Sequence, residues 1–415
     1  MTDIRLVHMA DIHLGYTGSI SLIFGEGERG AGRYVREVDI EQAVRRLTES
    51  IRDAQPPVDV VIIAGDLFHR SVPLPRAIAR AARMVNVLIS AGIDVVIVDG
   101  NHETSSSMHP GSPTVYLAEL GAHVANGGDC LVLQGDRWHN PRLRGTLAVH
   151  ALPYRAVLER QFPGVVPVSG CLNVLVTHGR IKGMKEEMNT LGRVTSDIPS
   201  EVLSRGWDYV ALGDSHFHRY QPMQQAPAYY AGSLEALNFG EATAYPPQRD
   251  DRNAVRGAID VRLRPGAQAV LSTLENVGRR PVLRLKAIDA ADMEPETLMQ
   301  ALHDRITAEL PREALVRLEV TACPIDVYER LDHEAIYRLC QQFRRCEIPF
   351  GTVYPVAEQN GATASEASLN DQWEAFIASQ IGDDMELPWY LEQGQQRIEA
   401  ARMQVQGARL ESGEE

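Results

Sequence analysis

Five apolar, strand-like runs in this chain each end beside side chains that readily bind metal ions. The runs are Ile4–Ala10, Val58–Ala64, Ile93–Val98, Leu172–Thr177 and Tyr209–Leu212. The side chains that follow them are, in the same order, Asp11 and His13, Asp66, Asn101, His178, and Asp214 and His216. In an open α/β sheet, ligands gather just outside the carboxyl ends of the strands. The pattern therefore predicts that these five strand ends share one site.

The length and composition of the chain limit what surrounds that site. At 415 residues the chain is expected to form two or three domains. No apolar run approaches the roughly 20 residues of a membrane helix, and the N-terminus has no signal-peptide pattern. We therefore expect a cytoplasmic protein that makes no membrane contact. The five cysteines contain no Cys-x-x-Cys pair, so neither a disulfide framework nor a zinc ribbon is indicated.

The formal net charge of −14 gives DNA binding no support of its own. The charge is uneven, because residues 351–415 hold twelve acidic residues against three arginines. A metal site also adds positive charge that this count omits. The charge therefore does not exclude a nucleic-acid partner.

The first part of the chain alternates strand runs with helical patterns, which is typical of a layered α/β domain. Helices are expected at Asp39–Arg52 and Pro75–Ser90, and further strands at Tyr229–Glu235 and Ala258–Leu263. A passage rich in Pro, Gly and Arg follows, so the first domain is expected to span residues 1–270.

A small α+β domain is expected at residues 275–357, after the first. Its expected elements are the strand Val282–Ala287, the helix Pro295–Glu309, the strand Leu315–Thr321, the helix His333–Arg345 and the strand Gly351–Val356. Residues 358–415 are expected to be a linker and a helical tail. The helix predicted at Trp389–Leu410 either docks on its own domain or is offered to a partner.

The motifs at the strand ends suit a pair of divalent metal ions. Two such ions, roughly 3.5–4 Å apart, can hold both the attacking and the leaving oxygen of a phosphoryl displacement. Asp66 is well placed to bridge them, and Gly65 and Gly100 allow the sharp turns that aim the following side chains. Carboxylate, amide and imidazole ligands together favour manganese or a similar ion. Each motif alone is usually a simple turn, but five in one order make a shared metal site the better interpretation.

These motifs resemble those of the calcineurin-like metallophosphoesterases and, more narrowly, of the SbcD-type DNA double-strand-break repair nucleases. The narrower resemblance lies in Gly-Asp-Leu-Phe-His at residues 65–69, in Tyr230–Glu235 and in Asn-Phe-Gly-Glu at residues 238–241. It implies a sheet domain, a small capping domain and a helical tail. It also implies manganese-dependent 3′-exonuclease and endonuclease action at DNA ends, a homodimer, and an SMC-like coiled-coil ATPase partner of the SbcC type.

The resemblance also assigns roles to residues. The family pattern implies a first ion held by Asp11, His13, Asp66 and the last residue of the ligand set. It implies a second ion held by Asp66, Asn101, His178 and the penultimate residue. His102 would donate a proton to the leaving oxygen or stabilise its charge, and His69 would help to place the phosphodiester.

The chain departs from the family at the fifth strand, where the family has Leu-Gly-His-x-His and this sequence has Leu-Gly-Asp-Ser-His-Phe-His at residues 212–218. Without a gap, Asp214 and His216 are the last two ligands. With a two-residue slip in the alignment, the last two ligands are His216 and His218. We prefer the ungapped alternative, because Asp is a good ligand for hard divalent ions.

Basic residues beside the strand ends are candidates for phosphate contacts. Arg70, Arg180, Lys182 and Lys185 could each neutralise a backbone phosphate, and on the ungapped alternative so could His218. A metal-dependent DNA phosphodiesterase is thus our preferred hypothesis. A phosphoesterase for cyclic nucleotides or other small esters, and a non-catalytic DNA-end scaffold for the ATPase, are the alternatives.

Overall fold

The computed structural model describes residues 3–18, 31–104, 111–181, 197–224, 226–248, 251–307 and 309–353. These residues belong to one compact unit, Met1–Val353. The predicted linker and helical tail at 358–415 lie outside the described residues. Because no boundary divides the compact unit, the division into domains at 1–270 and 275–357 stays a prediction.

One mixed sheet carries the first three predicted strands. Its strands, in spatial order, are β14 (Val270–Glu275), β13 (Gly257–Leu263), β1 (Ile4–Met9), β2 (Val60–Ala64), β3 (Asp94–Val98) and β4 (His123–Ala125). The strands β1 to β4 run parallel, and β13 pairs antiparallel with both β1 and β14. The carboxyl ends of β1, β2 and β3 therefore lie at one edge of this sheet.

A second sheet carries the other two predicted strands. Its strands, in spatial order, are β11 (Ala228–Tyr230), β10 (Tyr209–Gly213), β7 (Leu172–His178), β6 (Leu147–Leu152) and β5 (Leu131–Leu133). All the neighbouring pairs are parallel except β5 with β6. The five predicted strand ends thus belong to two sheets.

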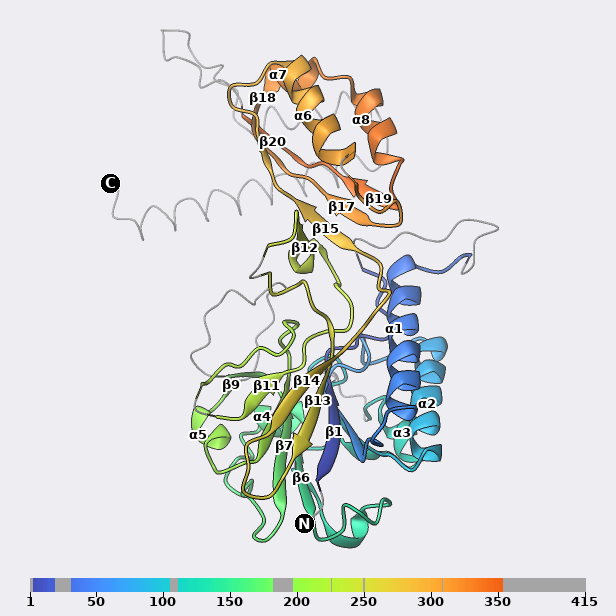
Figure 1. The fold of residues 1–415 in the computed structure, drawn as a ribbon, viewed down its shortest axis with the longest axis vertical. Coiled ribbons are helices and arrows are strands. Elements are labelled where there is room, and N and C mark those ends of the chain that lie inside the picture. The colour runs from blue at the N-terminus through green and yellow to red at the C-terminus, as the bar shows by residue number, and fades with distance from the viewer. Residues whose placement is uncertain are drawn as a thin grey trace, which may run out of the picture. The chain divides into compact units, whose positions relative to one another are not determined.

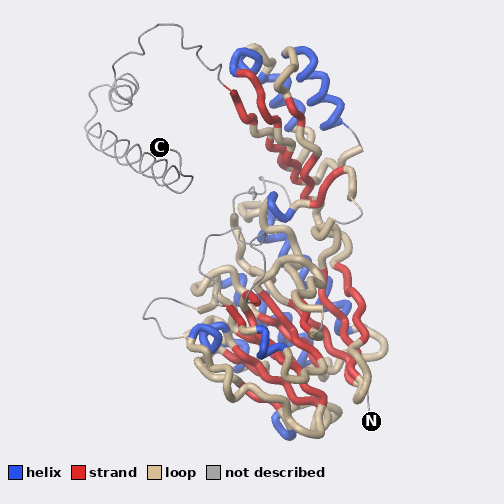
Figure 2. The backbone as a smooth tube through the Cα atoms, turned by 90° about the vertical axis from the view of Figure 1, so that its left-hand side faces the viewer, coloured by secondary structure: helices blue, strands red, loops and turns tan. Residues whose placement is uncertain are grey.

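The two sheets pack face to face (Figures 1 and 2). Apolar side chains from both sheets form one cluster between them. Alternate side chains of β1 pack on opposite faces of the sheet, because successive side chains of a strand point to opposite sides. Leu6 joins the core between the sheets, whereas Val7 faces the helices on the outer side. The strands are buried on both faces, which explains why they read as continuous apolar runs instead of alternating ones.

Helices cover the outer faces of both sheets. The helices α1 (Val35–Arg52) and α2 (Pro75–Ser90) pack on the first sheet. The short helices α4 (Tyr154–Leu158) and α5 (Ser200–Leu203) contribute to the apolar cluster on the outer face of the second. The predicted layered α/β architecture is confirmed. No helix within the described ranges is both long and apolar enough to cross a membrane.

Several connecting elements are short. They are α3 (Val115–Ala118), the two-residue strands β8 (Arg180–Ile181) and β9 (Asp197–Ile198), and the 3-10 turns η1 (Gly135–Arg137) and η2 (Phe239–Glu241). The strand predicted at Tyr229–Glu235 was too long, because β11 ends at Tyr230 and the chain then turns. Gly232 in that turn has a φ of +79°, which a strand residue does not adopt.

Residues 281–353, together with the earlier strand β12, form two small parallel sheets with helices, around a separate apolar cluster. One sheet contains β12 (Thr243–Tyr245), β15 (Val282–Leu285), β17 (Leu315–Arg317) and β19 (Arg345–Glu347), and the other contains β16 (Ile288–Asp289), β18 (Val320–Pro324) and β20 (Phe350–Val353). The helices are α6 (Pro295–Thr307), α7 (Ile325–Glu329) and α8 (His333–Cys340). The single strand predicted at Leu315–Thr321 is divided, since β17 and β18 pair in different sheets.

Candidate metal centre

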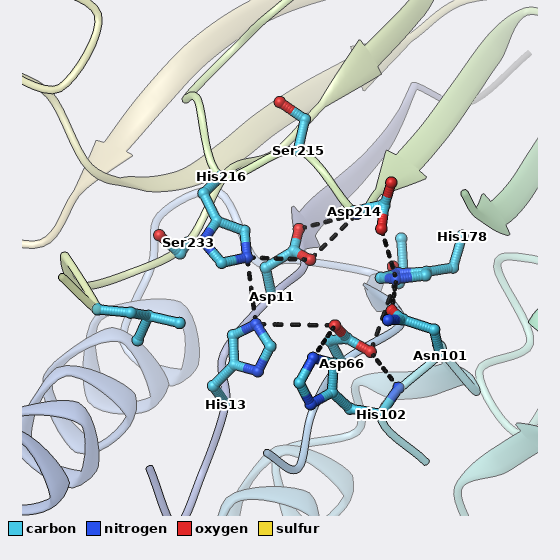
Figure 3. A network of polar contacts seen from close by, with 12 residues as sticks. Asp11, His13, Asp66, Asn101, His102, His178, Asp214, Ser215, His216 and Ser233 are labelled. Atoms are coloured by element: carbon cyan, nitrogen blue, oxygen red, sulfur yellow. Dashed lines mark hydrogen bonds and ion pairs between the residues drawn. The ribbon is translucent and has the colours of Figure 1, made fainter. Parts of the chain in front are cut away.

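The five predicted strand ends meet in space. Figure 3 shows side chains from all five at one place. These are Asp11, His13, Asp66, Asn101, His102, His178, Asp214 and His216. The side chains of Asp11 and His178 are fully buried, whereas 20% of the His216 side chain is exposed. The cluster therefore reaches from the interior to solvent.

Backbone hydrogen bonds fix the first loop to the second. The amide of Asp11 donates to the carbonyl of Gly65 at 3.1 Å, and the amide of His13 donates to that of Asp66 at 2.9 Å. Asp11, His13 and Asp66 have φ angles of 51°, 54° and 53°. Residues other than glycine rarely adopt this left-handed conformation, and such residues concentrate at functional sites.

A second set of bonds joins the two sheets at the cluster. β10 and β7 are in register, with Gly213 beside His178, so Asp214 emerges next to that histidine. The amide of Asp214 donates to both carboxylate oxygens of Asp11, at 3.0 and 3.2 Å. Asp11 follows the first sheet and Asp214 the second, so this contact fixes one sheet against the other.

The two predicted turn glycines differ in what they provide. Gly65 has a φ of +86°, as a sharp turn requires. Gly100 is not in the left-handed region; instead, a Cβ there would lie 2.2 Å from Oδ1 of Asp66. Gly100 is therefore needed for space, because the Asp66 carboxylate packs against its backbone.

The side chains form two adjoining groups around Asp66. In the first, Nε2 of His13 lies 3.2 Å from Nε2 of His216 and 3.7 Å from Oδ2 of Asp66. In the second, Nε2 of His178 lies 3.6 Å from Oδ1 of Asp66 and 3.8 Å from Oδ1 of Asp214. Asp66 presents one oxygen to each group, as a bridging carboxylate would.

The carboxylates carry more negative charge than their protein neighbours balance. In the described part of the chain, the ion pairs of Asp11, Asp66 and Asp214 are all with histidines. Burial raises the pKa of Asp11 to about 7, and the carboxylates of Asp66 and Asp214 add to the rise, although His216 and His178 lower this pKa. Burial also raises the pKa of Asp214. Such a group of crowded carboxylates fits divalent cations.

The pKa values of His178 and His13 shift in opposite directions, for different reasons. Although burial lowers it, the pKa of His178 is raised to about 9 by Asp66, Asp11 and Asp214. Burial lowers the pKa of His13 well below its usual value, and the neighbouring histidines lower it further. His13 is thus neutral near pH 7, the form in which imidazole binds a metal.

The amide of Asn101 adds a second test of fit. Turned one way, its nitrogen donates to both oxygens of Asp66 at 3.2 Å. Turned the other way, its oxygen faces those carboxylate oxygens and lies 2.9 Å from Nε2 of His178. The second orientation gathers lone pairs around one point, which a cation stabilises. The donor set therefore fits divalent metal ions.

Hydrogen bonds to the far nitrogen orient three imidazoles. Nδ1–H of His178 donates to the carbonyl of Ala64 at 2.9 Å, and Nδ1–H of His102 donates to that of His69 at 2.7 Å. Nδ1 of His216 lies 2.9 Å from the carboxylate of Glu241. In each case Nε2 is left facing the cluster. This is the usual outer support of metal-binding histidines.

Two buried glutamates support the site and were not predicted to do so. Glu241, in η2, orients His216. Burial alone would raise the pKa of the Glu241 carboxyl, but His216 lowers this pKa below its usual value. Glu103 accepts hydrogen bonds from the amides of Asp66, Phe68 and Gly100, at 3.1, 2.6 and 2.9 Å. Glu241 lies in the Asn-Phe-Gly-Glu motif at residues 238–241 that carried the resemblance, but the motif gave no sign of this supporting role.

His102 and His69 lie at one side of the candidate centre, next to Asp66 and His13. Nε2 of His102 is 3.8 Å from Oδ2 of Asp66, and its amide donates to Oδ1 of Asp66 at 3.0 Å. His69 is half-buried; its Nδ1 lies 3.4 Å from Nδ1 of His13, and its ring packs against those of His102 and Tyr16.

The predicted phosphate-contact residues are dispersed. Arg70 is exposed, and Arg180, half-buried, is near enough to Asp214 to influence its pKa. Lys182 and Lys185 lie outside the described residues. Nδ1 of His218 lies 2.8 Å from the carbonyl of Ala231, and its Nε2 lies 3.0 Å from the hydroxyl of Thr273.

The geometry at the fifth strand favours the ungapped alternative. Asp214 and His216 both join the cluster. Both ring nitrogens of His218 are engaged elsewhere, and burial lowers its pKa to about 4. The assignment of the individual ligands stays a prediction.

Comparisons with known proteins agree with this architecture. The chain is 28% identical over 264 residues to DNA double-strand break repair protein Mre11 of Methanopyrus kandleri, covering 60% of this chain and 51% of that protein. It is 26% identical over 260 residues to Mre11 of Archaeoglobus fulgidus, covering 60% and 54%. It is 23% identical over 262 residues to the SbcD subunit of the nuclease SbcCD from Staphylococcus saprophyticus, covering 57% and 62%.

The chain matches about half the length of the two archaeal relatives. The predicted similarity to SbcD-type proteins is confirmed. The family model described as calcineurin-like phosphoesterase matches residues 4–241, more than half of the chain. This range holds the five strand ends and both supporting glutamates. The chain therefore belongs to the calcineurin-like phosphoesterase family.

Proposed function

We propose that this protein is a metal-dependent phosphodiesterase that processes DNA ends in double-strand-break repair, as a 3′-exonuclease and an endonuclease. The observation that carries the proposal is the convergence of three carboxylates, including that of Asp66, with one amide and three imidazoles. The relatives, which include DNA double-strand break repair proteins and a component of a nuclease, support DNA as the substrate.

Two divalent ions, taken to be Mn²⁺, would occupy the two groups. Asp11, His13, Asp66 and His216 would hold the first. Asp66, Asn101, His178 and Asp214 would hold the second. The close approach of Asp11, His13 and His216 supports the first set. The approach of His178 to Asp66 and Asp214, at 3.6 and 3.8 Å, supports the second. When bound, such ions activate water and neutralise the charge that gathers on the phosphate oxygens.

The protein's own part is to position these groups and to move a proton. Nδ1 of His102 carries a hydrogen, because a backbone carbonyl can only accept. Its Nε2 faces the cluster and is the atom that would donate a proton to the departing oxygen. His69, packed against that ring, would guide the phosphodiester toward it. Both catalytic roles rest on this arrangement.

Contacts with the DNA backbone would come from basic residues around the centre. The exposure of Arg70 and the proximity of Arg180 to Asp214 support these two as phosphate contacts. Lys182 and Lys185 are proposed with them. His218 is the weakest of these candidates, because both of its nitrogens have protein partners.

The proposed assembly follows the relatives. Residues 1–270 would form the nuclease domain and residues 275–357 the capping domain. The segment 358–415 would bind a coiled-coil ATPase of the SbcC type. We also propose a homodimer that acts in the cytoplasm. One relative is named as one component of a larger nuclease, which supports an assembly with another protein.

The proposal is tested with linear duplex DNA and a small phosphodiester such as bis(p-nitrophenyl) phosphate. The variants are Asp66→Asn and, as a matched control, the exposed Asp136→Asn. We expect Mn²⁺-dependent release of nucleotides by the unchanged protein and by Asp136→Asn, and its loss in Asp66→Asn.

Two results would contradict the proposal. Hydrolysis of the small ester with intact DNA would favour a small-molecule phosphoesterase. Binding of DNA ends without any metal-stimulated cleavage would favour a scaffold.

A further inference from the structure

A second group of metal-binding side chains lies away from the candidate metal centre. Asp94 is the first residue of β3, His123 is the first residue of β4, and His139 lies in the loop between η1 and β6. The carboxyl end of β3 leads to Asn101. A five-residue strand spans roughly 16 Å, so the group lies at the opposite end of the sheet from that centre.

The three side chains converge on one carboxylate oxygen. Nε2 of His123 lies 2.9 Å from Oδ1 of Asp94, and Nδ1 of His139 lies 3.1 Å from the same atom. The three donor atoms all lie within 4.8 Å of one another. Two ligand atoms about 2.0–2.1 Å from one zinc ion are at most roughly 4.2 Å apart, so a small adjustment places an ion among them.

The surrounding residues hold this arrangement in place. The amide of Asn140 donates to Oδ2 of Asp94 at 2.8 Å, which fixes the plane of the carboxylate. The imidazoles of His123 and His139 stack, with centroids 4.9 Å apart and an interplanar angle of 18°. The buried Trp138 ring meets His123 edge-on at 5.4 Å, and its Nε1–H donates to the carbonyl of Leu147 at 2.9 Å.

The charge of Asp94 has no arginine or lysine partner within the described ranges, where its ion pairs are with the two histidines. Its side chain is fully buried. The neighbouring Asp59, in contrast, pairs with Arg142 at 2.9 Å. A buried carboxylate with two imidazoles and no thiolate is a donor set suited to zinc and similar divalent transition metals.

The group is also accessible and joins distant segments. The side chain of His139 is 62% exposed, which leaves a route for an ion and room for a water ligand. β3 and β4 belong to the first sheet, whereas the loop with His139 leads into β6 of the second. An ion there would cross-link the two sheets.

We propose that Asp94, His123 and His139 bind one divalent transition-metal ion of the zinc type, which joins the two sheets at the end opposite the phosphoesterase centre. The site is structural and is independent of the proposed nuclease activity. Because the ion replaces the imidazole protons that now face Asp94, binding weakens as the pH falls.

The test uses the full-length chain, stripped with chelator, saturated with Mn²⁺ and then exposed to Zn²⁺. Bound zinc is counted by elemental analysis after gel filtration. The variants are His139→Ala and, as a matched control, His303→Ala, which removes an exposed histidine 3.9 Å from a carboxylate. Zinc that enters the phosphoesterase centre is common to all the proteins, so the difference between them reports the new site.

We expect the unchanged protein and His303→Ala to retain one zinc ion per chain more than His139→Ala. Zn²⁺ should also raise the melting temperature of the first two proteins above that of the third. Equal zinc content in all three proteins would overturn the proposal. Should the protein fail to cleave DNA, the zinc count would still stand, so the two proposals fail separately.

Discussion

At the scale of single residues, a variant of His102 can distinguish a loss of catalysis from a loss of metal binding. Its Nε2 faces the cluster, yet the proposed ligand set does not include it. We predict that His102→Ala retains its metal and loses turnover of a DNA or small-ester substrate by about 10²-fold or more, because proton transfer alone contributes that much. Steady-state rates and elemental analysis of the same sample measure both. Loss of bound metal together with activity would contradict this role.

Glu241 should act through His216 and not on the substrate. Its carboxylate accepts from Nδ1–H of His216, which leaves Nε2 for the cluster. We predict that Glu241→Gln weakens Mn²⁺ binding by roughly 10- to 100-fold, the usual effect of removing an outer partner of a metal ligand. Calorimetric titration measures this affinity. If high Mn²⁺ concentrations fail to restore turnover in the variant, the positioning role is wrong.

The sequence indicated most of this cluster, because each ligand candidate lies within four residues of the end of an apolar run. It could not indicate Glu103 or Glu241 as supports. Each contacts residues that lie elsewhere in the chain, such as Phe68 for Glu103 and His216 for Glu241. Only the fold brings those partners together, so no local pattern marks them. The engagement of His218 with Thr273, 55 positions away, was invisible for the same reason.

At the scale of elements, the tight contact between the second and third loops leads to a prediction. A Cβ on Gly100 would lie 2.2 Å from Oδ1 of Asp66, whereas a Cβ on Gly164 would meet nothing within 4 Å. We predict that Gly100→Ala displaces Asp66 and lowers both metal affinity and turnover at least tenfold, while Gly164→Ala changes neither. Calorimetry and rate measurements compare them. Equal metal affinity and turnover in the two variants would mean that the loops move enough to accommodate the added methyl group.

The buried strand β1 predicts a dependence of stability on pH. His8 is fully buried, and burial lowers its pKa from 6.5 to about 3. Between these values the unfolded chain binds a proton that the folded chain does not, so the free energy of unfolding falls as the pH drops from 6.5 toward 3. One such group contributes at most about 1.4 kcal/mol per pH unit.

The test compares the unchanged protein with His8→Gln, which keeps a polar partner for Tyr209 but does not titrate. Denaturant unfolding of metal-free protein at several pH values measures the slope. We expect a shallower slope for His8→Gln between pH 4 and 6. Identical slopes would show that His8 is protonated in the folded state.

The long elements were predictable because their burial is regular. The helix α2 has the predicted bounds, and β1, β2 and β3 differ from the predicted runs by one or two residues. The division of the five strands between two sheets, with β1, β2 and β3 in one and β7 and β10 in the other, was not predictable. A strand buried on both faces has the same composition whichever sheet it joins. The division between β17 and β18 was missed because both strands are short.

At the scale of the whole molecule, the proposed partner segment can be separated from the chemistry. Every described residue of the candidate centre lies before residue 242. We predict that deletion of residues beyond 370 spares hydrolysis of a small ester and abolishes co-purification of a coiled-coil ATPase. Pull-down from cells that express both proteins, alongside ester hydrolysis, measures this. Unchanged co-purification would mean that the tail packs on its own domain.

The hydrogen bonds from the Asp214 amide to the Asp11 carboxylate connect two ligand candidates that follow strands of different sheets. The position of the Asp11 carboxylate therefore depends on how the two sheets lie against each other. Any shear of the sandwich would change the spacing of the ligands, and filling the centre should in turn stiffen the layers. Amide exchange in β1 and β10 should therefore slow together when Mn²⁺ is added, although neither strand supplies a ligand from within its own bounds. The rigidity of the two-sheet core, measured by amide exchange, would then rise with the metal occupancy of the centre.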